Sequence, residues 1–202
     1  MTAYSSLTPP RLKMQSVHVL SLTLLCALAA SAQVISFGRC PKPAVQANFD
    51  PSKYIGRWYE IEKLPTGFQK GECGTATYSA KSAGVIGVFN SELLKDGTIN
   101  SIAGSAKVKS PEEPAKLEVS FSGTPPGPYW VLSSDYEGHS LVYGCQELGI
   151  FKGELSWILS REPTISDETR EELHSILTAA GVDAGKMVRT NQDRNYCSPM
   201  DQ

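Results

Sequence analysis

The chain has 202 residues, of which 41% are hydrophobic and 20% are charged, and its formal net charge at pH 7 is -2. This length and composition suit one globular domain with a sizeable core. Because there is no large surplus of basic residues, no nucleic-acid partner is expected.

The N-terminal segment has the features of a secretory signal. The basic residues Arg11 and Lys13 precede an apolar run over residues 17–30, and the small-residue sequence Ala30-Ser31-Ala32 follows. The apolar run is too short to predict a membrane span. The protein is therefore expected to be secreted and extracellular.

The start of translation has two readings. Met1 gives an N-terminal extension before the signal, whereas Met14 gives a compact signal. In both readings we assign residues 1–32 to the extension and signal peptide, and residues 33–202 to one secreted domain. Residues 33–55 are expected to form an extended segment that leads into the folded part.

Four cysteines follow the predicted signal, and all are expected in disulfides. An even number of cysteines in an exported chain implies two disulfides, with three possible pairings. Paired thiols leave no free nucleophile, and the three histidines are scattered along the chain, so neither a reactive cysteine nor a metal site is expected. The four residues are Cys40, Cys73, Cys145 and Cys197.

Short hydrophobic segments with the character of β-strands fill the middle of the chain. Turn residues separate them, including the hairpin signal Lys95-Asp96-Gly97, and no helical pattern occurs among them. The predicted fold class is all-β, an eight-stranded up-and-down antiparallel barrel, because closure removes exposed strand edges. The predicted strands span residues 56–64, 74–81, 85–94, 98–108, 117–121, 129–133, 140–147 and 154–161.

The hydrophobic period changes after the eighth predicted strand. Ser166 is a favourable N-cap, and apolar residues then fall on one helical face before Gly181. We expect one C-terminal α-helix packed on the outside of the barrel, followed by a short strand at residues 186–190 and a tail that ends at Cys197. The apolar face consists of Leu173, Ile176, Leu177 and Ala180.

An eight-stranded barrel is wide enough to hold one small ligand, and strand alternation predicts its lining. A lining of apolar residues with a few uncharged polar groups suits an apolar guest that carries one or two polar atoms. The alternative is a barrel filled by its own side chains. Residues that share a face are Trp157 with Leu155 and Leu159, Phe121 with Val119 and Leu117, Tyr78 with Ala76 and Ala80, and Val88 with Asn90.

Glu60 and Glu62 do not fit a simple apolar lining. On strict alternation both share a face with Trp58, so either they lie inward at the barrel mouth or the strand contains a bulge. Their spacing is compatible with an acid–base pair. Since the chain offers no free pocket thiol and no evident Ser-His-Asp set, however, we do not expect an enzyme.

Three sequence blocks give the chain a resemblance to the lipocalin family. Gly56-Arg57-Trp58 lies on the first predicted strand, Ser134-Asp135-Tyr136 lies between the sixth and seventh, and Arg161 ends the eighth. The block before the seventh strand has serine where the family has threonine. The resemblance implies that Arg161 stacks on Trp58 and helps to close the barrel base. Within the family, residues 40–197 look most like the apolipoprotein D subfamily and its invertebrate relatives.

The resemblance also implies a disulfide pairing and a set of ligand-binding residues. The family pairing corresponds to Cys40–Cys145 and Cys73–Cys197. Two positions correspond to polar pocket groups, Tyr78 and Asn90. Four others correspond to apolar walls, namely Phe121, Tyr129, Trp157 and Leu159.

The predicted function is a secreted carrier that holds a fatty acid, a steroid-like compound or another lipid in the barrel. One alternative is a pigment carrier for biliverdin or a carotenoid, and another is a protein that acts through its loops on a protein partner. No cofactor is expected. The loop at residues 123–127 has no bulky apolar residues, so no stable membrane insertion is expected either.

Overall fold

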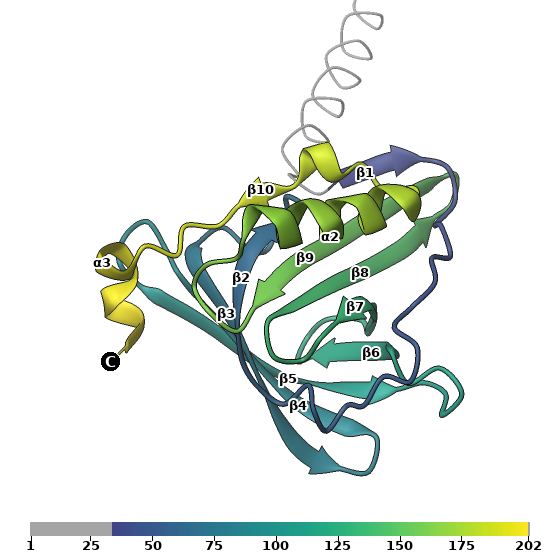
Figure 1. Cartoon of the computed structure of the whole chain (residues 1–202), viewed down its shortest axis with the longest axis horizontal. Coiled ribbons are helices and arrows are strands. Elements are labelled where there is room, and N and C mark those ends of the chain that lie inside the picture. Colours follow the sequence, from purple (N-terminus) through teal and green to yellow (C-terminus); the bar gives the residue numbers. More distant parts are fainter. Residues whose placement is uncertain (1–33, 202) are drawn as a thin grey trace, which may run out of the picture. The chain divides into compact units, whose positions relative to one another are not determined.

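Eight antiparallel strands close into a barrel in the computed structural model, which describes residues 34–201 (Figure 1). Each strand pairs with the next along the chain, and the last pairs with the first. The predicted barrel is confirmed, whereas the predicted signal segment lies outside the described residues. The barrel strands are β2 (Gly56–Lys63), β3 (Glu72–Ser82), β4 (Val85–Leu93), β5 (Ile99–Val108), β6 (Lys116–Phe121), β7 (Gly127–Ser134), β8 (His139–Leu148) and β9 (Phe151–Ser160).

Two short strands extend the barrel sheet. β1 (Val34–Phe37) pairs with β9, and β10 (Val188–Arg189) pairs with β2. The sequence analysis expected only an extended segment where β1 lies, and it began the eighth barrel strand at residue 154. The β8–β9 hairpin in fact continues to a turn at Gly149, and this longer β9 provides the pairing edge for β1.

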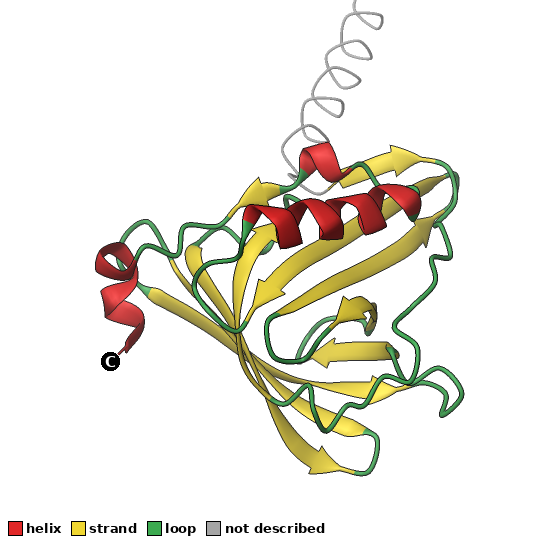
Figure 2. Ribbon diagram, viewed as in Figure 1, coloured by secondary structure: helices red, strands yellow, loops and turns green. Residues whose placement is uncertain are grey.

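The C-terminal helix α2 (Asp167–Ala179) lies along the outer face of the barrel, as predicted (Figure 2). The side chain of Ser166 caps it by accepting a hydrogen bond from the backbone N–H of Thr169. Its buried Leu173 and Leu177 pack on the barrel wall in one apolar cluster with Leu141, Tyr143 and Ile158, among others. In the described part of the chain, no helix combines the length and apolar character needed to cross a membrane.

The strand predicted at residues 186–190 is shorter than expected. Asp183 accepts a hydrogen bond from the backbone N–H of Gly185, which turns the chain into the 3-10 helix η1 (Ala184–Lys186) and delays β10. The tail then forms α3 (Arg194–Cys197), capped by Asp193, and η2 (Ser198–Asp201).

Two apolar cores lie on opposite sides of the barrel wall, because neighbouring residues of a strand point to opposite faces. Val142 of β8 packs inside with Trp58, whereas its neighbours Leu141 and Tyr143 pack outside with helix α2. The inner core is the part of the fold that positions the candidate site.

Both expected disulfides are present. Cys40–Cys145 ties the N-terminal segment to β8, and Cys73–Cys197 ties the start of β3 to the C-terminal helix α3. All four cysteines of residues 34–201 are therefore bonded.

Candidate functional site

Arg161 closes one end of the barrel. Its guanidinium carbon lies 3.8 Å from the centroid of the Trp58 ring, and its N–H groups donate to the backbone carbonyls of Ile55 and Tyr136, both at 2.9 Å. Gly56 has a positive φ of 106°, and a Cβ atom there would lie 3.0 Å from Arg161 Nη1. Glycine at this position therefore allows both the backbone turn and the close approach of the guanidinium.

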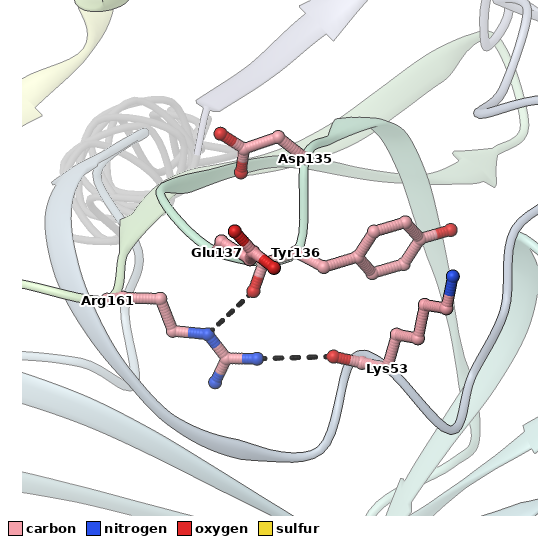
Figure 3. A pocket seen from close by; sticks show the side chains of 5 residues that line it. All are labelled: Lys53, Asp135, Tyr136, Glu137 and Arg161. Atoms are coloured by element: carbon pink, nitrogen blue, oxygen red, sulfur yellow. Dashed lines mark hydrogen bonds between the residues drawn. The ribbon is translucent and has the colours of Figure 1, made fainter.

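A cleft of about 630 Å3 lies beside Arg161 and is lined by Lys53, Asp135, Tyr136, Glu137 and Arg161. Figure 3 shows the hydrogen bonds from Arg161 to the carbonyls of Tyr136 and Lys53 across it. These bonds join three separate chain segments. The residues that line the cleft therefore hold the base of the barrel closed.

The Asp135 carboxylate organises the turn between β7 and β8. Its Oδ1 accepts hydrogen bonds from the backbone N–H groups of Gly138, at 2.9 Å, and His139, at 2.7 Å. Partial burial acts to raise the pKa of Asp135, but the backbone hydrogen bonds from His139 and Gly138 outweigh it and leave the pKa below its ordinary value. The folded state therefore favours the charged carboxylate.

Replacing Asp135 by asparagine is expected to lower the free energy of unfolding by about 0.5–1 kcal/mol at pH 7, because an amide oxygen accepts weaker hydrogen bonds than a carboxylate. Since the folded pKa is depressed, the carboxylate stabilises the fold above its ordinary pKa of 3.8 and loses this effect below it. Urea denaturation at pH 7 and pH 3 measures the difference. The control Glu137→Gln, at an exposed neighbouring residue, should show no loss of unfolding free energy at either pH. An equal loss at pH 7 and pH 3 for Asp135→Asn would contradict the role of the charged carboxylate.

The structure places the predicted ligand residues together on the inner face of the barrel. Tyr78 and Leu159 are buried in the inner core, and Phe121, Tyr129 and Trp157 are half-buried against it. Trp58 is fully buried, so solvent does not reach the inner core around its ring. Phe121, Tyr129 and Trp157 stay partly exposed beside this core, and their contact with a ligand stays a prediction.

Three tyrosine hydroxyls meet inside the barrel. Tyr129 Oη lies 3.1 Å from Tyr54 Oη and 2.7 Å from Tyr78 Oη, and Tyr54 Oη lies 2.9 Å from Ser140 Oγ. The hydroxyl of Tyr78, predicted to face the ligand, thus has a protein partner. Sequence reasoning missed Tyr54 and Ser140, because neither has a local signal: Tyr54 enters the interior from the segment before β2.

Burial keeps these tyrosines neutral. It raises the pKa of Tyr54 to about 12, against the smaller lowering effects of the hydrogen bonds from Ser140 and Tyr129 and of the charge on Arg161. Burial, followed by repulsion from the neighbouring tyrosine groups, raises the pKa values of Tyr78 and Tyr129 well above 10. The interior therefore offers uncharged polar groups at physiological pH.

Asn90 carries an unpaired acceptor inside the barrel. It shares the inner face of β4 with Ile86 and Val88, which are both buried in the inner core. Its Oδ1 is buried and is the single buried side-chain nitrogen or oxygen of residues 34–201 without a hydrogen-bond partner. A buried acceptor without a partner costs about 1–3 kcal/mol of stability, and a water or ligand donor would remove that cost.

The pairing of β2 with β9 shifts between Glu60 and Glu62, which resolves the alternatives for these residues in favour of a bulge. Glu60 is buried at the inner side and receives hydrogen bonds from Lys63 and Thr190. Glu62 is buried on the other side, where its Oε2 lies 2.5 Å from Nε2 of His174 on helix α2. The two carboxylates therefore do not face one another as an acid–base pair would.

Exposed apolar side chains gather at the tip of the β8–β9 hairpin and on β1. Phe37 and Phe151 form an edge-to-face pair with ring centroids 6.0 Å apart, and Leu148, Ile150 and Ile35 are also exposed. The antiparallel pairing with β2 puts this tip at the barrel end opposite Arg161. The prediction of no stable membrane insertion rested on the composition of the 123–127 loop alone. It therefore did not take these exposed apolar side chains into account.

No group of three or more His, Cys, Asp or Glu side chains that could hold a metal ion occurs within residues 34–201. The only histidine–carboxylate pairs found there, His139 with Asp135 and His174 with Glu62, lie outside the inner core.

Comparison with known proteins gives consistent matches along most of the chain. The family model described as "Lipocalin-like domain" matches residues 49–192. Apolipoprotein D of Macaca fascicularis is 48% identical over 182 residues, which cover 87% of this chain and 96% of the relative. Outer membrane lipoprotein Blc of Escherichia coli K12 is 36% identical over 180 residues, covering 85% and 98%. Lobster apocrustacyanin A1 superposes with a TM-score of 0.73 at 20% identity, over 83% of this chain and 97% of that one.

Proposed function

The chain belongs to the lipocalin family, and on that premise we propose that it is a secreted carrier which holds a small hydrophobic ligand, such as a fatty acid, a steroid-like compound or another lipid, inside its barrel. The names of two relatives, apolipoprotein D and outer membrane lipoprotein Blc, refer to lipid. The inner face of this chain supplies an apolar surface and a few neutral polar groups, which suit such ligands, and its Glu60 carboxylate is paired with Lys63.

The observation that carries this proposal is the unpaired Oδ1 of Asn90. A ligand that presents a hydroxyl or N–H group would satisfy this acceptor, while the half-buried rings of Phe121 and Trp157 cover its apolar part. Burial of 250–300 Å2 of apolar ligand surface would contribute about 6–8 kcal/mol before the costs of association.

Secretion and a non-enzymatic role complete the proposal. Two disulfides, Cys40–Cys145 and Cys73–Cys197, are typical of proteins that fold in an oxidising compartment. The same bonds remove the thiols that a nucleophilic mechanism would use, and the β2 bulge separates Glu60 from Glu62. These features favour binding over turnover.

The first test is native mass spectrometry of the secreted protein without refolding, followed by organic extraction and titration with fatty acids, steroids, biliverdin and carotenoids. We expect a lipid to copurify with the protein, and we expect compounds of the same chemical class to quench its tryptophan fluorescence. Trp157→Ala should abolish most of this quenching, whereas Trp130→Phe, whose side chain lies on the outer face, should not. A barrel that is isolated empty and is quenched by none of these compounds would contradict the carrier proposal.

Asn90→Leu tests the role of the unpaired Oδ1, because it should stabilise the empty protein but weaken ligand binding. Removing the unpaired acceptor should raise the free energy of unfolding of the empty protein by about 1 kcal/mol. It should also weaken the binding of a ligand that carries a hydrogen-bond donor by about 1–3 kcal/mol, or roughly 5- to 150-fold in Kd, because the ligand group loses its partner. Calorimetry and urea denaturation measure both effects. Ser91→Ala, the adjacent residue on the opposite face, is the control, and unchanged affinity in Asn90→Leu would refute the assignment.

A further inference from the structure

The side chain of Gln69 fastens the loop between β2 and β3 to the inner wall. Its Oε1 accepts a hydrogen bond of 2.8 Å from the indole Nε1 of Trp157. Its Nε2 donates a hydrogen bond of 2.8 Å to Oε2 of Glu60. The backbone N–H of Gln69 is also held, by Oγ1 of Thr66 at 2.9 Å. The amide thus joins the loop to β2 and β9 at once.

The orientation of the Gln69 amide follows from its two partners. An indole N–H can only donate a hydrogen bond, and an ionised carboxylate can only accept one. The amide oxygen must therefore face Trp157, and the amide nitrogen must face Glu60. The reverse orientation would leave both contacts repulsive.

Glu60 is itself held in place by further contacts. Its Oε1 receives hydrogen bonds of 2.7 Å from Nζ of Lys63 and 2.7 Å from Oγ1 of Thr190. Gly74 leaves the space for it, because a Cβ atom at that residue would lie 3.0 Å from the Glu60 carboxyl carbon. A turn of the Gln69 amide would break both of its hydrogen bonds.

We propose that Gln69 is a specificity-determining residue, which occupies the indole N–H of Trp157 and so withholds a hydrogen-bond donor from ligands that carry a carboxylate. This inference rests on the proposed carrier function. A carboxylate that reaches this wall meets the carbonyl oxygen of Gln69 with the Glu60 carboxylate behind it, and the Lys63 charge is already paired with Glu60. A neutral alcohol lacks this repulsion.

The masking of the indole can be measured in the empty protein. Nuclear magnetic resonance of protein labelled with 15N at tryptophan follows the exchange of each indole hydrogen, and Trp157→Phe assigns the Trp157 signal. Gln69→Leu keeps an apolar side chain in the loop but removes the acceptor, so Trp157 exchange should accelerate about tenfold or more. Trp58, whose Nε1 donates to the carbonyl of Tyr54, is the internal reference. Unchanged Trp157 exchange would overturn the proposal.

The selectivity is measured by calorimetric titration with decanoic acid and decan-1-ol at pH 7.4. In Gln69→Leu, the ratio of the Kd for the acid to the Kd for the alcohol should fall by about two- to tenfold relative to the wild type. Lys70→Ala, an exposed neighbour in the same loop, should leave the ratio unchanged. In a Trp157→Phe background the freed N–H is absent, so Gln69→Leu should change the ratio by less than it does when Trp157 is present. An equal change in both backgrounds would overturn the masking role.

The outcomes separate this inference from the function on which it rests. Binding of both probes with an unchanged ratio in Gln69→Leu overturns the role of Gln69 and leaves the carrier function standing. Binding of neither probe by any variant, together with an empty protein from secretion, overturns the carrier function and the selectivity role with it.

Discussion

Replacement of Cys73 and Cys197 together by serine is expected to lower the free energy of unfolding by about 2–5 kcal/mol. The disulfide links residues 124 positions apart, so its loss returns a large loop entropy to the unfolded chain. It also releases the tail that brings Thr190 and Gln192 onto β2 and β3, where Gln192 Nε2 donates to the carbonyls of Glu60 and Gly74.

Urea denaturation of the wild type and of the variant that lacks Cys73 and Cys197 measures this loss, under non-oxidising and under oxidising conditions. The paired variant of Cys40 and Cys145 is the matched comparison, since its separation of 105 residues predicts nearly the same entropic contribution. Any additional loss in the Cys73 and Cys197 variant reports the contacts of the tail. A double variant that unfolds within about 0.5 kcal/mol of the wild type would contradict the expectation, because that is the range of an ordinary surface change.

The second large effect is a steep loss of stability above pH 10, caused by the tyrosines inside the barrel. In the unfolded chain these groups ionise near pH 10, but in the folded state the pKa of Tyr54 is about 12 and those of Tyr78 and Tyr129 are also raised. Because the folded pKa values are raised, their stabilising effect is complete below pH 10 and declines as the pH rises. Each of these three tyrosines contributes a slope of about 1.4 kcal/mol per pH unit in this window.

Urea denaturation at pH 8, 10 and 11 gives this slope. Tyr129→Phe removes one of the three ionisable groups, so the slope above pH 10 should fall by about 1.4 kcal/mol per pH unit. The exposed residue Tyr196 provides the control variant, Tyr196→Phe, which should behave like the wild type. Identical slopes in the wild type and Tyr129→Phe would show that the tyrosines do not control alkaline unfolding.

The base of the barrel shows how far local sequence signals reach. The sequence blocks that carry the family resemblance named Gly56, Trp58 and Arg161, and in the structure the guanidinium carbon of Arg161 lies 3.8 Å from the centroid of the Trp58 ring. The strands also follow from their alternation and their turn residues, because these signals act between near neighbours in the chain.

The polar groups of the interior were only partly predictable. Asn90 was named from the family resemblance, in agreement with strand alternation, and it is the residue with the unpaired buried oxygen. Gln69 was not named, since its loop sequence shows only glycine and proline turn signals. Its role depends on Trp157, which lies 88 residues further along the chain.

By itself, the sequence determined the barrel, the outer helix and the alternation of inward and outward residues, since these features depend on hydrophobic period and local turn chemistry. The tertiary structure decided the bulge that sends Glu60 and Glu62 to opposite faces, the contact of Tyr54 with Tyr129, and the bridge from Gln69 to Trp157. The reason is physical. Hydrogen bonds between side chains far apart in sequence depend on exact strand register and loop position, and no local pattern of residues records either of them.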